Sequence, residues 1–526
     1  MPAPAAKAAQ TKDRAPRTPP GRRIGALARP TPALMIQGTG SHVGKSFLVA
    51  GLCRAFARRG LDVRPFKPQN MSNNSGLANL SGETGFGEIG RAQVLQAQAC
   101  NVAPGVDMNP VLLKPQGDRS AQVVVQGRVW RNASATGYRD LRSELLPRVL
   151  ESFARLEACA DVVVVEGAGS PAEVNLRARD IANMGFAVRA RVPVVLAGDI
   201  DRGGVLAALV GTWQLLAPEE RALIGGFIVN KFRGDPALFA DGPEVVTRAT
   251  KLRSFGVVPY LAEAALLPAE DSVVLDSSVS AFGEKRAGKI RIAVPRLPHI
   301  SNFDDLDPLA SERGVEIVVV PSGRALPRDA DVVLLPGSKA ALADLACLRA
   351  EGWDVDIAAH ARSGGTVVGL CGGYQMLGTR IEDPQGQEGP PGAAAGLGLL
   401  DIATVIGGEK TLRPARGLSL LGGETIAGFE MHMGETSGAG LARPWLALDD
   451  GRCDGAISAD GRVMGGYVHG LFASDAFRGG FLARLGARAT GGNFAGRVDS
   501  ALDAIAARLE DSLDVDALLA LARGRT

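Results

Sequence analysis

The chain has 526 residues, of which 46% are apolar and 22% charged, a composition typical of a globular protein with about two or three domains. Its 58 basic and 56 acidic residues give a net charge of +2, so charge gives no reason to expect nucleic acid or an anionic membrane as a main partner. No apolar run is long enough to span a bilayer, and the six cysteines form no CxxC pair. These features predict reduced thiols and a cytoplasmic protein.

The N-terminal part of the chain begins with an irregular segment and then alternates strands with helices. Residues 1–30 are rich in Ala, Pro and Arg and are predicted to form a disordered tail without a secretory signal. A buried strand at Ala33–Ile36 then leads through a glycine-rich turn into a helix over Gly44–Arg59. Further β-branched strands are expected at Asp161–Val165, Val192–Ala197 and Gly226–Asn230.

A second α/β series begins at Lys289, after a stretch of weak periodicity. Continuous β-branched strands separated by helices are typical of parallel sheets covered on both faces. We therefore predict an α/β protein with two doubly wound, mainly parallel-sheet domains, at 33–245 and 289–526, joined by a linker region at 246–288. The second domain is expected to end in C-terminal helices. Its predicted strands are Ile290–Val294, Val315–Val320, Val332–Leu335 and Thr366–Leu370.

A glycine-rich segment lies where the first strand becomes a helix. Glycines let the loop backbone turn its N–H groups toward phosphate oxygens, and the helix dipole adds positive potential there. Lys45 would supply a mobile charge, although the first glycine of the standard phosphate loop falls here on Thr39. We predict a phosphate-binding loop for ATP made of Gly38, Thr39, Gly40, Ser41, His42, Val43, Gly44, Lys45 and Ser46.

An acidic residue, Glu166, follows the strand Asp161–Val165 directly. Ligands of open α/β sheets bind at the carboxyl ends of the strands. A carboxylate there and the hydroxyl of Ser46 are suitable ligands for Mg²⁺, so we predict that these two residues hold the metal. Glu166 taken alone is equally consistent with a solvated strand end.

Two loops of the first domain are dense in amides and hydroxyls. This hydrogen-bonding capacity suits a large, polar substrate that carries amides and carboxylates. Ordinary turn chemistry explains the same residues, because Asn and Ser are common turn formers. The predicted substrate-binding residues are Gln69, Asn70, Ser72, Asn73 and Asn175.

The sharpest feature of the second domain is Cys371, which lies between an apolar strand and a helix in the pattern Gly-x-Cys-x-Gly. This is the nucleophile-elbow pattern with sulfur in place of oxygen. The following helix N-terminus activates the thiol and offers the N–H of Gly372 to an oxyanion. A buried structural cysteine is the alternative. The loop at 334–339, which contains Gly337, would supply the second oxyanion donor.

A thiol nucleophile needs a base, and two histidines compete for this role. His469 follows a strand-like run nearly a hundred residues after Cys371, and His432 lies in a polar segment before it. Spacing does not choose between them.

Several blocks of the chain together resemble the cobyric acid synthase family. They include the phosphate loop, the Lys67–Ser75 block, Met108–Pro115, the Cys371 elbow and Tyr467–Gly470, and the resemblance runs from about residue 33 to 480 and beyond. The resemblance implies a dethiobiotin-synthetase-like ATP domain joined to a class I glutaminase. It implies ATP and Mg²⁺ as cofactors and glutamine and a corrinoid as substrates, without nucleic acid or membrane partners.

The resemblance also implies the reaction and the base. The family amidates the b, d, e and g carboxylates of adenosylcobyrinic acid a,c-diamide, and its motif assigns Cys371 as nucleophile and His469 as base. Class I glutaminases usually carry a glutamate two residues after this histidine, but Leu471 stands here, so the group that orients His469 is not identified.

Two other functions compete with this one. Cobyrinic acid a,c-diamide synthase is the nearer alternative, but its aspartate-rich block is replaced here by Gln69–Ser72. A P-loop switch ATPase without glutaminase activity is the more distant alternative, and the Cys371 elbow argues against it.

Overall fold

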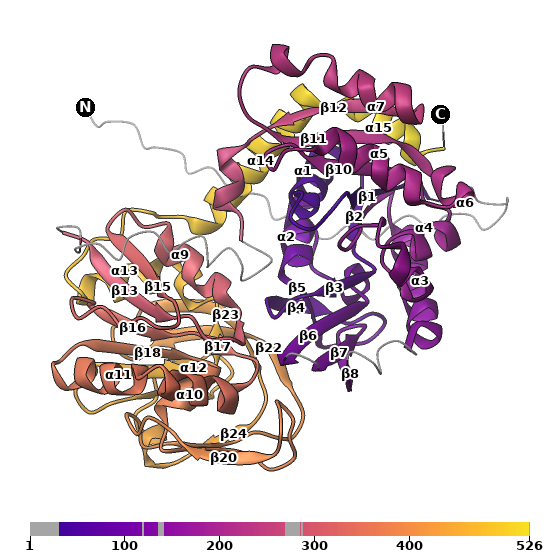
Figure 1. Ribbon diagram of the computed structural model, residues 1–526. Helices are drawn as coiled ribbons and strands as arrows, with labels where there is room; N and C mark the ends of the chain where they lie inside the picture. The colour runs from indigo at the N-terminus through magenta and orange to yellow at the C-terminus, as the bar shows by residue number, and fades with distance from the viewer. Residues whose placement is uncertain (1–30, 118–119, 135–140, 269–284, 286–287, 525–526) are drawn as a thin grey trace, which may run out of the picture. The chain divides into compact units, whose positions relative to one another are not determined.

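The first sheet follows the predicted alternation of strands and helices. The computed structural model describes residues 31–117, 120–134, 141–268, 285 and 288–524, so the predicted tail at 1–30 lies outside the described residues. Six parallel strands run in the order β12-β11-β10-β1-β9-β2. Figure 1 labels these strands except β9. They are β1 (Ala33–Gly38), β2 (Val63–Phe66), β9 (Val162–Glu166), β10 (Val194–Asp199), β11 (Ile224–Phe232) and β12 (Arg253–Pro259).

Helices and two small sheets complete this first half. The helices are α1 (Lys45–Arg58), α2 (Arg91–Ala99), α3 (Arg142–Cys159), α4 (Met184–Ala190), α5 (Val205–Leu215), α6 (Pro218–Arg221) and α7 (Gly242–Thr250). One small sheet has the order β3-β6-β7-β8 and the other pairs β4 with β5. Their strands are β3 (Gln69–Met71), β4 (Ser75–Asn79), β5 (Phe86–Gly90), β6 (Val111–Gly117), β7 (Ser120–Val125) and β8 (Arg128–Ser134).

The second half contains another six-stranded sheet, in the order β15-β13-β16-β18-β28-β27, which is parallel except for β27 at its edge. The strands are β13 (Ile290–Pro295), β15 (Val315–Val320), β16 (Val332–Leu335), β18 (Thr366–Leu370), β27 (Ala456–Ile457) and β28 (Val463–Gly466). The helices are α9 (Asp307–Ala310), α10 (Ala341–Ala350), α11 (Trp353–Arg362), α12 (Gly372–Leu377) and α13 (Asp475–Arg484). The predicted α/β class with mainly parallel sheets is confirmed.

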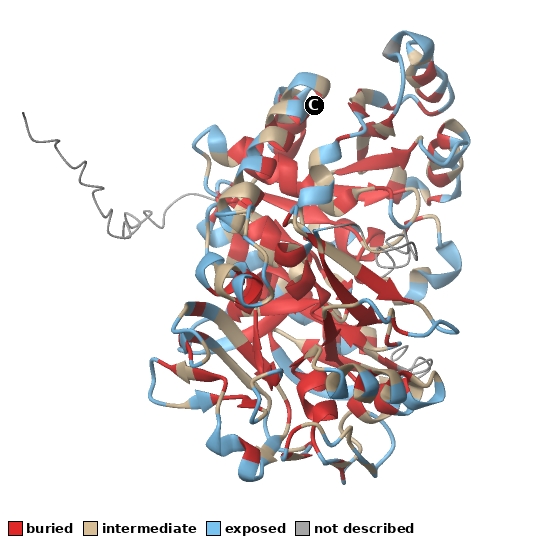
Figure 2. Cartoon of the chain, turned by 90° about the vertical axis from the view of Figure 1, so that its left-hand side faces the viewer, coloured by how far each residue is buried: buried red, intermediate tan, exposed pale blue. Residues whose placement is uncertain are grey.

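Smaller sheets extend the second half beyond its main sheet. A two-stranded sheet pairs β14 (Ile300–Ser301) with β17 (Gly337–Ser338). A four-stranded sheet contains β19 (Arg380–Asp383), β20 (Gly392–Ala395), β21 (Ala403–Val405) and β24 (Glu435–Ser437). A five-stranded sheet contains β22 (Thr411–Ser419), β23 (Thr425–His432), β25 (Leu446–Leu448), β26 (Cys453–Asp454) and β29 (Val468–His469). Figure 2 shows the buried residues concentrated in the strands and the exposed ones on the outer helices and loops.

Strand β12 corrects the predicted boundary of the first domain. Residues 246–288 were expected to form a linker, but β12 within them pairs in parallel with β11 and closes the first sheet. Phe255 and Val258 of this strand are buried. The sheet therefore extends beyond residue 245. The strand was missed because its serine and glycine interrupt the β-branched pattern. Residues 269–284 lie outside the described residues.

The C-terminal helices correct the other boundary. The helices α14 (Phe494–Ser512) and α15 (Val515–Ala522) were expected to close the second domain, but α14 packs along α1 and α15 contacts β1 and β12. The apolar stripe Val498, Leu502, Ile505 and Leu509 joins the core formed by α1 and the first sheet. Helical spacing predicted the stripe correctly but does not say which surface covers it. The described residues from Thr31 onward belong to one compact unit.

Shortening Leu509 to alanine is expected to destabilise the first half by about 2–5 kcal/mol, because it leaves a cavity in a fully buried contact. Leu509 packs directly over Gly51 of α1, where an added Cβ would meet its Cδ1 at 2.4 Å. Urea unfolding followed by nucleotide binding measures the effect. Asp511→Ala, at an exposed position of the same helix, serves as the control. Equal unfolding midpoints for the two variants would contradict the packing role.

Candidate active site

Cys371 lies on a strained turn between β18 and α12. Its φ of 51° and ψ of −108° belong to a region that L-residues rarely adopt. The turn packs closely against the end of β16 and against β17: a Cβ on Gly372 would lie 2.8 Å from the backbone nitrogen of Ser338, and one on Gly373 would lie 2.2 Å from the carbonyl oxygen of Leu335. The glycines after Cys371 are therefore needed for this close approach.

His469 lies at the end of β29, next to β23, and is held by an acidic residue from far upstream. Its ring Nδ1 lies 2.7 Å from Oδ2 of Asp305. The backbone N–H of Gly470 donates to Oδ1 of the same carboxylate at 2.6 Å. Both side chains are almost completely buried. Asp305 therefore fixes the ring that stands beside Cys371, and it is the orienting group that the sequence left unidentified.

The electrostatic environment of His469 favours its charged form. Burial acts to lower the pKa of His469, but the carboxylate of Asp305 and the side chain of Cys371 outweigh it and raise the pKa to about 10. Because this pKa is raised above the ordinary value, the charged pair stabilises the fold fully below about pH 6.5. This contribution is lost as the pH rises through about 10.

His432 occupies a different setting in the same region. Its ring stacks on Tyr467 with 3.7 Å between the centroids. Burial lowers the pKa of His432 to about 4, and its Nδ1 has no hydrogen-bond partner among the described residues. Among the described residues His432 thus has no hydrogen-bonded carboxylate like Asp305, and its pKa is lowered where that of His469 is raised, so the geometry favours His469 as the partner of Cys371.

Gly337 and Gly372, the predicted oxyanion donors, both lie beside the thiol and the imidazole. Gly337 belongs to β17, and a Cβ added to it would meet Cε1 of His469 at 3.2 Å. Asp344 anchors this segment, because it accepts hydrogen bonds from the hydroxyl of Ser338 at 2.6 Å and from the backbone N–H of His299 at 3.1 Å. Both glycines are therefore close enough to the thiol and the imidazole to be tested as oxyanion donors.

The predicted phosphate loop lies between β1 and α1. Gly44 caps the helix with a φ of 94°, which favours glycine. The ammonium of Lys45 donates to the carbonyl oxygens of Gly40 at 3.1 Å and Gly169 at 2.9 Å. The side-chain amide of Asn230 holds the loop from outside by donating to the carbonyl of Val43 at 2.9 Å. The loop is thus held by Asn230 of β11 and by the segment that follows β9.

Glu166 and Ser46, the predicted metal ligands, contact each other at the carboxyl end of β9. The hydroxyl of Ser46 donates to Oε1 of Glu166 at 2.7 Å. Lys67 donates to the same oxygen at 2.9 Å, and Gln96 of α2 donates to Oε2 at 2.5 Å. Glu166 is fully buried. Through these hydrogen bonds it connects the predicted phosphate loop to α2 and to the residue that follows β2.

Comparisons with known proteins decide the family. A model of the CobQ/CobB/MinD/ParA nucleotide binding domain matches residues 34–274, and a model of the CobB/CobQ-like glutamine amidotransferase domain matches residues 291–477. Cobyric acid synthase of Rhizorhabdus wittichii is 60% identical over 491 residues, covering 93% of this chain and 99% of that protein. The chain belongs to the cobyric acid synthase family. It is therefore an ATP-dependent glutamine amidotransferase, a carbon–nitrogen ligase of cobalamin biosynthesis.

Other relatives agree with this family. Cobyric acid synthase of Methylocella silvestris is 58% identical over 488 residues, which is 93% of this chain and 100% of that protein. Among solved structures, PurLQS from Thermotoga maritima has a TM-score of 0.29 at 19% identity and covers 41% of this chain and 98% of its own. The cell division protein MinD of Aquifex aeolicus has a TM-score of 0.27 at 13% identity and covers 48% of this chain and 92% of its own.

No helix in the described part of the chain is long and apolar enough to cross a membrane.

The predicted substrate residues of this family member fall into different settings. Gln69 lines a pocket beside the phosphate loop, together with Ser170 and Asn183. Asn70 and Asn73 donate within the fold, to Gln93 at 3.0 Å and to the carbonyl of Pro115 at 3.1 Å.

Two more of the predicted substrate residues lie apart from this pocket. Ser72 is buried and accepts from the N–H of Asn74 at 3.0 Å. Asn175 is exposed on a short 3₁₀ helix. Only Gln69 of the predicted set therefore lines the pocket.

Asp305 and its neighbour Asp304 are the residues that sequence reasoning missed. Asp304 forms an ion pair with Arg91, the first residue of α2, at 2.6 Å. The same helix reaches Glu166 through Gln96, so one short helix touches the surroundings of both sites. The sequence feature that could have pointed to them is the polar block around Asp304 and Asp305, which lies between two strands of the second half.

Proposed function

We propose that this enzyme amidates the b, d, e and g carboxylates of adenosylcobyrinic acid a,c-diamide to give adenosylcobyric acid. The observation that carries the proposal is the presence of a phosphate loop and a Cys371–His469–Asp305 arrangement in one chain that is 60% identical to a protein named cobyric acid synthase. Glutamine would supply the nitrogen and ATP the driving force.

The glutaminase step uses the residues around the thiol. The thiolate of Cys371 attacks the carboxamide carbon of glutamine, and backbone N–H groups of Gly337 and Gly372 stabilise the oxyanion. His469, held as a cation by Asp305, gives a proton to the departing ammonia. Water then hydrolyses the thioester to glutamate, and the liberated ammonia serves the second reaction.

The synthetase step uses the phosphate loop. A corrinoid carboxylate attacks the γ-phosphorus of ATP, so that an acyl phosphate forms and ADP leaves; ammonia then displaces phosphate and leaves an amide. Lys45 and the loop amides stabilise the transferring phosphoryl group. The pocket beside the loop contains Gln69, Asn183 and Arg179 together with the carboxylates Glu173 and Asp180, so it offers hydrogen-bond donors and acceptors to a polar substrate with carboxylates and amides.

Ser46 and Glu166 fit a magnesium site. The hydroxyl and the carboxylate are oxygen ligands 2.7 Å apart at the loop, and Mg²⁺ in such enzymes takes few protein ligands because phosphate and water oxygens complete its shell. In the described residues no cluster of three His, Cys, Asp or Glu side chains offers a protein-only metal site. When bound, the ion would neutralise charge on the phosphates.

Mass spectrometry of the a,c-diamide incubated with enzyme, ATP and glutamine tests the substrate. Four successive carboxyl-to-amide conversions are expected. No conversion of the a,c-diamide, combined with amidation of cobyrinic acid at two positions, would overturn the proposal in favour of a,c-diamide synthase.

Asp305→Asn is expected to lower glutamine hydrolysis by about 10²–10⁴-fold, because the ring of His469 loses the charge that orients it. The pKa of His469, now about 10, should fall, since only Cys371 then opposes the effect of burial. The alkaline limit of the pH–rate profile should therefore move to lower pH. Asp401→Asn, at an exposed carboxylate, is the control. A profile unchanged from the wild type would contradict the role of Asp305.

A further inference from the structure

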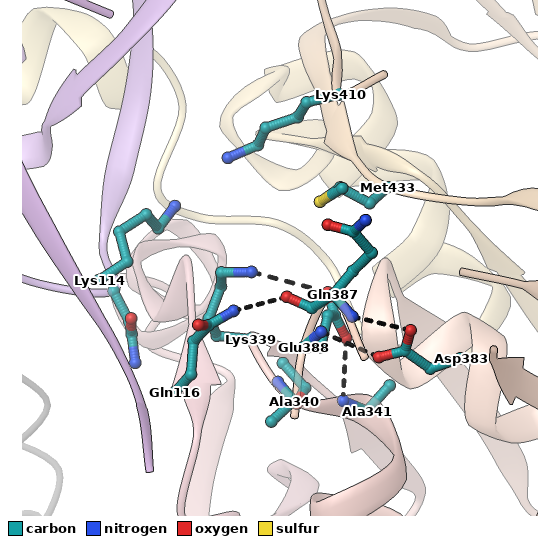
Figure 3. Close-up of polar contacts among 12 residues, drawn as sticks. Lys114, Gln116, Lys339, Ala340, Ala341, Asp383, Gln387, Glu388, Lys410 and Met433 are labelled. Atoms are coloured by element: carbon teal, nitrogen blue, oxygen red, sulfur yellow. Dashed lines mark hydrogen bonds and ion pairs between the residues drawn. The ribbon is translucent and has the colours of Figure 1, made fainter. Parts of the chain in front are cut away.

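Three lysines, Lys114, Lys339 and Lys410, line the same cavity as Cys371 and His469. Figure 3 shows their side chains approaching the same space from three separate segments. Their side chains are only 3%, 8% and 10% exposed, respectively. Buried lysines are rare and costly unless paired, so their presence beside the thiol requires an explanation.

Two carboxylates face these lysines. Glu88 of β5 is fully buried and pairs with both Lys114, at 2.8 Å, and Lys410. Glu388 lies 3.8 Å from Lys339 and accepts a hydrogen bond from the N–H of Ala341 at 3.2 Å. Each of the three ammonium groups thus faces a carboxylate, but Lys114 and Lys410 share Glu88, whose single negative charge offsets only one of their two positive charges.

The segment that carries Glu388 is held firmly in place. Asp383 accepts the backbone N–H groups of Gln387 at 2.8 Å and Glu388 at 2.9 Å. The side-chain amide of Gln116, on β6 of the first half, donates to the carbonyl of Gln387 at 2.8 Å (Figure 3). The charged groups are therefore preorganised, which is what recognition of a small charged ligand requires.

The lysine charges oppose one another. Burial, together with the charges of Lys114 and Lys339, lowers the pKa of Lys410 to about 7 against the opposing effect of Glu88. Burial likewise lowers the pKa of Lys339. An anion bound between these two ammonium groups would favour their charged forms and relieve this repulsion.

We propose that Lys339 and Lys410 bind the α-carboxylate of glutamine and that Glu388 binds its α-ammonium, with the carboxamide directed to Cys371. The proposal rests on the glutaminase function proposed above and assigns its specificity. Free glutamine carries both charges at the end opposite its carboxamide, whereas a glutamine within a peptide carries neither. The two lysines and Glu388 would therefore select the free amino acid.

Lys410→Met and Lys339→Met test the carboxylate contact with a pair of substrates. Glutamine α-amide (glutaminamide) keeps the size of glutamine but lacks the negative charge. The wild type should prefer glutamine over the α-amide by about 100-fold or more in kcat/KM, the effect of leaving buried charges without their partner. In each variant the preference should fall below about 10-fold, because hydrolysis of glutamine declines while hydrolysis of the α-amide changes little. Lys251→Met, at an exposed lysine, is the matched control.

Glu388→Gln tests the ammonium contact with a different analogue. Glutaric acid monoamide lacks the α-ammonium but keeps a carboxylate. Glu388→Gln should lose the preference for glutamine over this analogue and keep the preference over the α-amide, and the lysine variants should behave in the opposite way. The substituted glutamine still accepts the N–H of Ala341, so the fold is retained.

The outcomes separate this inference from the function on which it rests. The inference is supported if the lysine variants lose only the preference over the α-amide and Glu388→Gln loses only the preference over glutaric acid monoamide. If hydrolysis of glutamine and of both analogues falls equally in every variant, the residues are structural and the inference is overturned, although the glutaminase function stands. Absence of glutamine hydrolysis in the wild type overturns the proposed function and the inference together.

Discussion

Cys371→Ser is expected to lower glutamine-dependent amidation at least about 10³-fold and to leave amidation from ammonium salts near the wild-type rate. The thiol at the strained turn is needed only to release ammonia, and a serine hydroxyl at this position lacks the thiolate that attacks the carboxamide. Ammonium chloride bypasses this step because the synthetase site uses free ammonia. Both rates are measured by the same mass-spectrometric assay of the corrinoid.

The control for this experiment is Cys453→Ser, at an exposed cysteine in the same half of the chain. It should leave both nitrogen sources unaffected. Equal loss of both activities in a folded Cys371→Ser protein would show that the thiol acts in the synthetase step, and the division into two reactions would then be wrong.

Lys45→Met is expected to produce the complementary result, with amidation from glutamine and from ammonium both reduced by about 100-fold or more. The ammonium of Lys45 is held at the phosphate loop by the carbonyls of Gly40 and Gly169. Methionine keeps the length of the side chain but removes the charge that stabilises the transferring phosphoryl group.

Hydrolysis of glutamine to glutamate, measured without the corrinoid, should persist in Lys45→Met, because the residues around Cys371 are unchanged. The exposed Lys251→Met serves again as the control for loss of one positive charge. Undiminished amidation in Lys45→Met would contradict the assignment of this loop to ATP.

The sequence predicted the parts of the fold that depend on local pattern. Buried β-branched runs marked the central strands of both sheets, because a strand covered on both faces must be apolar throughout. The same pattern did not predict β12, an edge strand in which a glycine and a serine interrupt the β-branched residues. Sequence reasoning also assigned α14 to the wrong half, because an apolar stripe records that a helix is covered and not by what.

The site was predictable to a similar degree. Cys371 and Lys45 lie in turns that connect a strand to a helix, so their own neighbours in the chain reveal them. Asp305 could not be found in this way, because it lies far upstream of His469 and meets it only through the fold. Spacing left His432 and His469 equivalent, whereas the contacts of their rings differ sharply.

The return of α14 to α1 has a consequence for how the protein is made. The apolar surface of α1, completed when residue 58 is synthesised, is covered by a helix that begins at residue 494. At about 5–20 residues per second, roughly 20 to 90 s of synthesis separate the two. The nucleotide-binding half is therefore the first to leave the ribosome and the last to be finished. Throughout that interval a nascent chain leaves the face of α1 around Gly51 without the cover of Ile505 and Leu509, so this surface is where a ribosome-associated chaperone would be needed.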